Sequence, residues 1–196
     1  MTLYQFGQAV CRLYLNALFK VRIYGKENIP DKGAVLLCAN HISNNDPPLL
    51  GAYIKRPVRY MAKKELFKVP VLKTLLRKLG AFPVNRAGGD KQSLRTSLDI
   101  LKSGDMVGIF PEGTRSKTGE IGKGLSGAGF FALKSSAHVV PCAIIGPYKM
   151  RGRVTLVYGK PISMEEHRAN RTSAKEVTEL IMDEIQKLKD QYQDLS

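Results

Sequence analysis

A histidine and an aspartate five residues apart are the first candidates for chemistry in this sequence. His41 follows the apolar run 34–39, which is typical of a buried strand, and Asp46 precedes two prolines typical of a helix's first turn. A strand that ends at a histidine places the imidazole at the carboxyl edge of a sheet, where open α/β sheets bind ligands. Asp46 can accept a hydrogen bond from one ring nitrogen, which leaves the other nitrogen free to take a proton from a substrate.

The same two residues also allow other interpretations. Asp46 could cap the helix that begins at Pro47, with His41 as an ordinary loop residue. Ser43 and Cys38 lie near His41, so a covalent mechanism with one of them as the nucleophile is a further alternative. Neither residue lies in a G-x-S-x-G turn, and we therefore favour direct proton abstraction by His41.

A second loop with chemical potential, residues 110–116, also follows an apolar strand. Gly113 allows a tight turn that presents backbone N–H groups, and Arg115 offers a forked donor suited to phosphate. We expect Glu112 to orient Arg115 or the substrate, and an ion pair between the two that merely shapes the loop is the alternative. Three further residues could help to bind an anion: Thr114 through its hydroxyl, and the cations Arg86 and Lys123.

The elements that must position these loops alternate between strands and helices. Apolar or alternating runs predict strands at 20–24, 34–39, 56–62, 81–84, 106–110, 139–145 and 154–158. Periodicity and capping residues predict helices at 3–18, 47–54, 91–103 and 127–137, and a last helix that opens on the capping box Ser173–Glu176. One unbroken alternation predicts a single α/β domain with a mixed, mostly parallel sheet flanked by helices.

Two segments predict contact with a membrane surface. Residues 1–19 form an amphipathic helix, for which packing on the core is the alternative, and residues 20–196 form the catalytic domain. Within that domain, residues 63–80 carry six Lys or Arg and one acidic residue among apolar side chains, which favours an interfacial segment over a core-packed helix. No apolar run approaches the ~20 residues that span a bilayer as a helix.

The composition restricts the partners of the protein. The chain has 31 Lys and Arg against 17 Asp and Glu, so its net charge of +14 attracts phosphorylated substrates, acidic membranes or nucleic acid. The absence of tryptophan and of any recognition motif argues against nucleic acid. The three cysteines are widely spaced and fit neither a disulfide framework nor a zinc site, so we expect a reducing compartment and no metal.

Four sequence blocks, taken together, resemble the glycerolipid acyltransferase family. They are Asn40-His41-x-Ser43-x-x-Asp46-Pro47, Gly80-x-Phe82-x-x-x-Arg86, Phe110-Pro-Glu-Gly-Thr-Arg-Ser116 and Val140-Pro141. The resemblance extends from about Lys20 to Tyr158, is most specific in the first and third blocks, and is strongest to bacterial lysophosphatidic acid acyltransferases. It favours a catalytic pair over a helix cap.

The resemblance implies transfer of a fatty acyl group from a thioester to the free hydroxyl of lysophosphatidic acid, which yields phosphatidic acid. It implies that His41 is the general base, that Asp46 orients it, and that Arg115, Arg86 and the Gly113 backbone hold the acceptor phosphate. Acyl-CoA or acyl-carrier protein would be the donor, and no cofactor is implied. We expect a peripheral or monotopic protein on the cytoplasmic face of the cell membrane.

Three alternatives remain open at this point. The same chemistry could act on glycerol 3-phosphate or on another lysolipid. The protein could also bind anionic lipid without catalysis, or bind nucleic acid through its positive charge.

Overall fold

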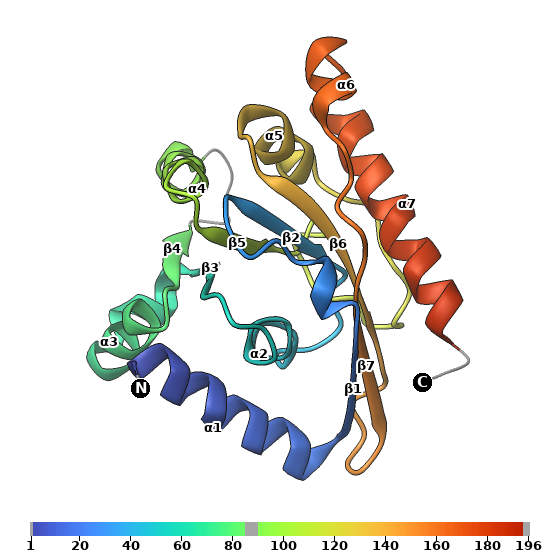
Figure 1. Cartoon of the computed structure of the whole chain (residues 1–196). Coiled ribbons are helices and arrows are strands. Elements are labelled where there is room, and N and C mark those ends of the chain that lie inside the picture. Colours follow the sequence, from blue (N-terminus) through green and yellow to red (C-terminus); the bar gives the residue numbers. More distant parts are fainter. Residues whose placement is uncertain (1, 85–89, 194–196) are drawn as a thin grey trace.

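The fold is built on a seven-stranded sheet with the strand order β1-β7-β6-β2-β5-β3-β4 (Figure 1). The computed structural model describes residues 2–84 and 90–193. Within these residues, β6 and β7 are antiparallel and the other neighbouring strands are parallel. The strands are β1 (Lys20–Tyr24), β2 (Val35–Ala39), β3 (Val58–Lys63), β4 (Phe82–Val84), β5 (Met106–Ile109), β6 (His138–Ile145) and β7 (Arg153–Tyr158). The predicted single α/β domain is confirmed.

Helices cover both faces of this sheet. α1 and α2 lie on one face, and α4, α5 and α7 lie on the other (Figure 1). The helices are α1 (Leu3–Leu18), α2 (Asp46–Ala52), α3 (Pro70–Lys78), α4 (Lys91–Lys102), α5 (Gly127–Lys134), α6 (Glu165–Ala169) and α7 (Ala174–Tyr192). Short 3-10 turns occur at Lys26–Asn28 and Lys64–Lys68. The capping box at Ser173 is present, whereas α6 had no clear sequence signal.

The central strand β2 shows how one sequence run serves two cores. Its side chains point alternately to opposite faces, as in any strand. Leu36 and Cys38 pack in the cluster formed with α5 and α7, whereas Val35, Leu37 and Ala39 pack in the cluster formed with α1 and α2. All five residues are buried, which explains why the run is continuously apolar instead of alternating.

The carboxyl ends of β2 and β5 bring the two candidate loops together. These strands are parallel neighbours, with Cys38 paired to Ile109 at their ends. The loop that contains His41 and the loop that contains Arg115 therefore leave the sheet side by side. The sequence predicted that each loop follows a buried strand, and the structure adds that these two strands are neighbours.

The N-terminal helix turns much of its apolar stripe away from the core. Leu3, Phe6, Val10, Leu13 and Tyr14 are all exposed, and Leu13 is 74% exposed. The helix packs instead through its other face, where Leu15 is fully buried. α1 therefore packs on the core through one face and leaves most of the predicted apolar stripe uncovered, so its contact with a membrane stays a prediction.

The segment 63–80 is similarly poorly covered. Leu66, Val69, Val71 and Leu75 are exposed, with Val71 at 81%. The segment forms a 3-10 turn and α3, and it lies beside the N-terminal end of α1 (Figure 1). Among the described helices, none combines the length and the apolar character that a bilayer crossing needs.

Two glycines on α5 give a matched test of the packing between α5 and α7. A Cβ added at Gly129 would collide with the backbone carbonyl of Ala174, whereas one added at Gly127 would meet nothing within 4 Å. We expect Gly129→Ala to destabilise the protein by about 1–3 kcal/mol through overpacking, and Gly127→Ala to stabilise it by about 0.4–1 kcal/mol. Urea denaturation of both variants measures the difference. Equal stabilities would contradict the described contact.

Candidate active site

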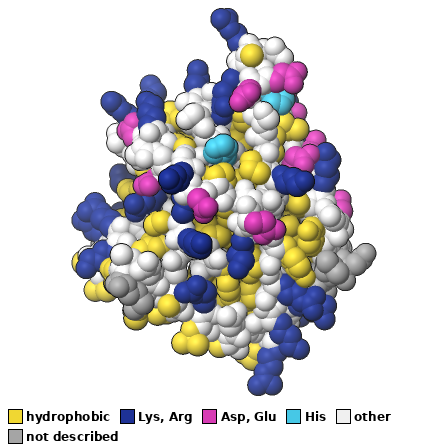
Figure 2. Space-filling model, viewed as in Figure 1, with side chains coloured by type: hydrophobic (Ala, Val, Ile, Leu, Met, Phe, Trp, Pro, Cys, Tyr) yellow, Lys and Arg dark blue, Asp and Glu magenta, His cyan; other side chains and the backbone are white. Residues whose placement is uncertain are grey.

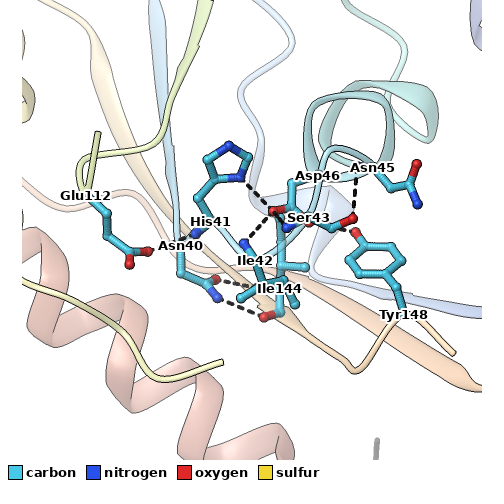
Figure 3. Close-up of polar contacts among 9 residues, drawn as sticks. All are labelled: Asn40, His41, Ile42, Ser43, Asn45, Asp46, Glu112, Ile144 and Tyr148. Carbon is cyan, nitrogen blue, oxygen red and sulfur yellow. Dashed lines mark hydrogen bonds and ion pairs between the residues drawn. The ribbon is translucent and has the colours of Figure 1, made fainter. Parts of the chain in front are cut away.

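The carboxylate of Asp46 collects four hydrogen bonds. Its Oδ2 accepts from His41 Nδ1 at 2.7 Å and from the backbone N–H groups of Ile42 and Ser43 at 2.6 and 2.7 Å. Its Oδ1 accepts from the hydroxyl of Tyr148 at 2.8 Å (Figure 3). Asp46 is fully buried, so these donors replace the water that a carboxylate would otherwise require.

This arrangement decides against the helix-cap interpretation of Asp46. Asp46 is the first residue of α2, and the N-cap position belongs to Asn45, whose side chain makes no capping hydrogen bond. The Asp46 carboxylate instead points back toward the loop 41–43. The aspartate therefore organises the loop that carries His41.

The His41 ring is held in one orientation. Nδ1 donates to the acidic Asp46, which leaves Nε2 as the free ring nitrogen with an available lone pair. The ring also stacks on Phe110 with a centroid distance of 4.1 Å. Its side chain is 12% exposed and lines a cavity, so this nitrogen is accessible to a bound molecule.

Glu112 supports the backbone of His41 and not the side chain of Arg115. Its Oε1 accepts from the His41 N–H at 2.8 Å, and its Oε2 accepts from the Gly122 N–H at 3.0 Å. No ion pair between Glu112 and Arg115 exists in the described part of the chain, so that alternative is wrong. Among the described residues, the hydrogen bonds of Glu112 go to these two backbone N–H groups and not to Arg115, and a role of Glu112 in orienting the substrate stays a prediction.

Gly113 adopts the tight turn expected of it, with φ +69°. However, its N–H donates to the Phe110 carbonyl at 3.0 Å and closes that turn. The N–H of Gly113 is therefore not free for a substrate. The loop is fastened to the first one by a further bond, from the Ser116 N–H to the His41 carbonyl at 2.7 Å.

Only some of the predicted anion-binding residues line the same cavity as His41. Arg115 and Thr114 are exposed and line the same cavity as His41, and Arg115 has no ion-pair partner among the described residues. Lys123 is exposed but does not line this cavity, because its segment folds back toward Glu112 and α7 through Gly122 and Gly124. Arg86 lies outside the described residues.

The cavity that holds His41 and Arg115, which we call the His41 cavity, has a volume of about 610 Å³. It extends from these polar side chains toward a largely apolar interior between α1, α2 and β3. The interior is lined by residues of α1 (Tyr4, Gly7, Gln8, Cys11), α2 (Pro47, Pro48, Gly51, Ala52), β3 (Tyr60, Met61, Ala62) and the segment 63–80 (Leu66, Leu76, Leu79). Both predicted membrane-contacting segments therefore form walls of the cavity.

The nucleophilic alternatives to direct proton abstraction lack the required geometry. Cys38 is fully buried in the core formed with α5 and α7, and burial raises the pKa of its thiol well above the ordinary range. A thiol in this environment is a poor source of thiolate. The hydroxyl of Ser43 accepts from the Asn45 N–H at 3.2 Å, and Ser43 lines a different cavity from His41.

Two residues that hold the His41 loop in place, Tyr148 and Asn40, were not predicted as site residues from the sequence. Tyr148, from the β6–β7 hairpin, donates to Asp46, and burial followed by the nearby Asp46 carboxylate raises the pKa of its hydroxyl, which keeps it protonated as a donor. The Asn40 amide donates to the Ile144 carbonyl at 2.9 Å and accepts from the Ile144 N–H at 2.7 Å (Figure 3). Asn40 had a signal through its place in the first block, whereas Tyr148 had none.

Comparisons with known proteins place this chain among acyltransferases. Residues 20–145 match the family model described as Acyltransferase. A 1-acyl-sn-glycerol-3-phosphate acyltransferase of Bacillus subtilis is 33% identical over 98% of this chain and 100% of the relative. The protein of the same name from Borreliella burgdorferi is 30% identical over 64% of this chain and 51% of its own length.

One solved structure shows the same fold. The crystal structure of the 1-acyl-sn-glycerophosphate (LPA) acyltransferase PlsC from Thermotoga maritima has a TM-score of 0.75 with this chain, at 24% sequence identity. The match covers 96% of this chain and 77% of that one. The sheet and its flanking helices are thus an architecture already observed experimentally.

The Tyr148 hydroxyl offers a test of how Asp46 is held. Tyr148→Phe keeps the ring that packs on Phe19 and removes one of the four donors to Asp46. We expect kcat to fall roughly ten-fold with substrate KM values unchanged, because a misoriented base slows only the chemical step. Steady-state kinetics of the variant measure both parameters.

The matched control is Tyr53→Phe, which removes a hydroxyl that donates to Asn16 and does not contact Asp46. It should retain the wild-type kcat. Equal kcat values for the two variants would show that Tyr148 does not position the aspartate.

Proposed function

Because this chain belongs to the acyltransferase family, we propose that it transfers a fatty acyl group from a thioester to the free hydroxyl of lysophosphatidic acid, producing phosphatidic acid. The observation that carries this proposal is one cavity. A free histidine nitrogen and Arg115, which has no ion-pair partner among the described residues, lie at its polar end, and mostly apolar side chains line the rest. An acceptor with a hydroxyl, a phosphate and a hydrocarbon chain matches these three features.

In the proposed reaction, Nε2 of His41 takes the proton of the acceptor hydroxyl as its oxygen attacks the thioester carbon. An ester C–O bond forms, the C–S bond breaks, and the proton passes from His41 to the leaving thiolate. Asp46 stabilises the transient imidazolium through Nδ1, as the aspartate does in serine hydrolases. The substrate's own hydroxyl is the nucleophile, so no covalent enzyme intermediate is required.

Arg115 is the proposed partner of the acceptor phosphate. Its guanidinium can donate two parallel hydrogen bonds to phosphate oxygens, and the neighbouring Thr114 hydroxyl can add another. Arg86 remains a proposed second cation. Fixing the phosphate fixes the glycerol, and this positioning lowers the barrier by making the attack effectively intramolecular.

The apolar interior of the His41 cavity favours a lysolipid over glycerol 3-phosphate as the acceptor. Glycerol 3-phosphate has no hydrocarbon chain with which to fill the space between α1, α2 and the segment 63–80. Removing the chain from water there contributes about 0.8 kcal/mol for each buried CH₂.

We propose that α1 (within residues 1–19) and the segment 63–80 attach the protein to the membrane surface as a peripheral or monotopic enzyme. Their exposed apolar side chains can enter the headgroup layer, and the Lys and Arg between them attract anionic lipid. Figure 2 shows basic and apolar side chains intermixed along the edge of the molecule that α1 and α3 occupy. The anionic lipid of the cytoplasmic leaflet makes that face the expected location.

His41→Ala tests the proposed chemistry. We expect it to lower turnover of lysophosphatidic acid by at least about 10²–10⁴-fold, the usual contribution of a general base, while binding to anionic vesicles is retained. The control, His167→Ala, changes a histidine on α6 that lies outside the cavity. Turnover by His41→Ala close to the wild-type value would contradict the role of His41 as the general base.

Arg115→Ala tests the phosphate contact. We expect kcat/KM for lysophosphatidic acid to fall about 10- to 100-fold, which reflects the loss of a charged hydrogen bond worth about 1.5–3 kcal/mol. Use of monoacylglycerol, which lacks the phosphate, should not change, and Arg95→Ala on the exposed face of α4 serves as the control. An equal loss with both acceptors would contradict a phosphate-specific role.

Leu13→Glu and Val71→Glu test the membrane attachment. Each replaces a highly exposed apolar side chain, so the fold should be unaffected. We expect each to weaken binding to phosphatidylglycerol vesicles about ten-fold or more, because a buried apolar side chain contributes about 1.5–3 kcal/mol. Vesicle co-sedimentation measures this, with Gln92→Glu on α4 adding the same charge elsewhere. Equal binding by all three variants would exclude these segments as the anchor.

A further inference from the structure

A second, larger hollow lies on the other side of the two active-site loops. This hollow, which we call the basic groove, has a volume of about 1030 Å³ and is separated from the His41 cavity by those loops. The two loops thus form a wall between the hollows, which we call the loop wall, and neighbouring residues of each loop line its opposite sides. His41 faces the His41 cavity and Ile42 the groove, and Arg115 faces the cavity and Ser116 the groove. The wall is held together by the bond from the Ser116 N–H to the His41 carbonyl.

The groove carries a strong excess of positive charge. Its lining includes six Lys or Arg and a single acidic residue, Glu120, which lies 3.5 Å from Lys189. The other five cations are exposed and have no ion-pair partner among the described residues: Lys20, Lys117, Lys149, Arg151 and Arg153. They come from three segments far apart in sequence, so tertiary folding gathers them. Basic side chains also occupy the lower end of the molecule in Figure 2, where the β6–β7 hairpin lies.

The base of the groove differs from its rim. Ile144 and Ile145 are buried at the end of β6, and Ile42 and Tyr148 are partly covered. A hollow with an apolar base, serine hydroxyls and a cationic rim suits a slender ligand that ends in phosphate. The charge of such a ligand would be met by the lysines and arginines, and its uncharged part by the base.

We propose that the basic groove binds the phosphate-bearing end of the acyl donor, whose pantetheine arm crosses the loop wall beside Ser43 and Ser116 to deliver the thioester to His41. This assignment rests on the proposed function and deepens it, since the acceptor phosphate and the donor phosphate would then occupy separate sites on either side of the wall. The shared ligand chemistry is a phosphopantetheine thioester, which both coenzyme A and acyl-carrier protein present.

The test removes charge from the groove and varies the phosphate on the donor. The variant Lys20→Gln/Lys149→Gln/Arg153→Gln removes three cations that contact neither Arg115 nor the His41 cavity. The control variant Lys91→Gln/Lys102→Gln/Lys134→Gln removes the same charge from the exposed surface of α4 and α5. Four donors are compared in neutral detergent micelles, which eliminate attraction to an anionic membrane: palmitoyl-pantetheine, palmitoyl-phosphopantetheine, palmitoyl-CoA and palmitoyl-acyl-carrier protein.

We expect the groove variant to raise KM at least about ten-fold, or about 1.4 kcal/mol, for the phosphorylated donors that the wild type uses. KM for palmitoyl-pantetheine and for lysophosphatidic acid should stay at wild-type values, and the control variant should match the wild type throughout. The donor for which the groove variant shows the raised KM, palmitoyl-CoA or palmitoyl-acyl-carrier protein, identifies the carrier of the acyl group. Unchanged KM values for both, or an equal rise for palmitoyl-pantetheine, would overturn the assignment.

A direct binding measurement separates this assignment from the proposed function. Titration calorimetry with phosphopantetheine alone should show binding to the wild type and to the control variant, and at least ten-fold weaker binding to the groove variant. If lysophosphatidic acid is not turned over while this difference persists, the proposed function fails and the groove assignment stands. If turnover is normal and all three proteins bind phosphopantetheine equally, the groove assignment fails alone.

Discussion

The buried carboxylate of Asp46 is the interaction on which the rest of the site depends. A fully buried carboxylate is tolerable only when donors replace its water, and here the donors come from one ring nitrogen, two backbone N–H groups and one tyrosine hydroxyl. Satisfying Asp46 therefore folds the loop 41–43 around it and draws in the β6–β7 hairpin. The orientation of His41 is a consequence of this local requirement.

The backbone of His41 is held as firmly as its side chain. The N–H of His41 donates to Glu112, and its carbonyl accepts from the Ser116 N–H. Because both partners belong to the loop after β5, the relative position of His41 and Arg115 is set by short hydrogen bonds on a rigid sheet edge. Such preorganisation suits the proposed reaction, in which the site orients a hydroxyl and takes its proton.

The loop wall separates two cavities whose linings differ in chemistry. On one side, α1 and the segment 63–80 close an apolar space whose outer walls carry exposed apolar side chains. On the other side, cations from β1, β7 and the neighbouring loops surround a groove. In the proposed reaction, the lipid acceptor and the charged donor thus approach His41 from chemically different surroundings.

Local patterns in the sequence determined most of the strands and helices, the capping box at Ser173, and the place of the His41 and Arg115 loops directly after buried strands. These features depend on periodicity and on capping residues, which short stretches of residues encode. Only the tertiary structure made β2 and β5 parallel neighbours and so brought the two loops together. Tertiary structure alone decided that Tyr148 bonds to Asp46 across 102 residues and that Glu112 supports the His41 backbone across 71. It also decided that the apolar stripe of α1 faces outward and that Lys123 lies away from the His41 cavity. Contacts between residues so far apart leave no periodic trace, because they depend on how completed elements pack and not on any element's own sequence.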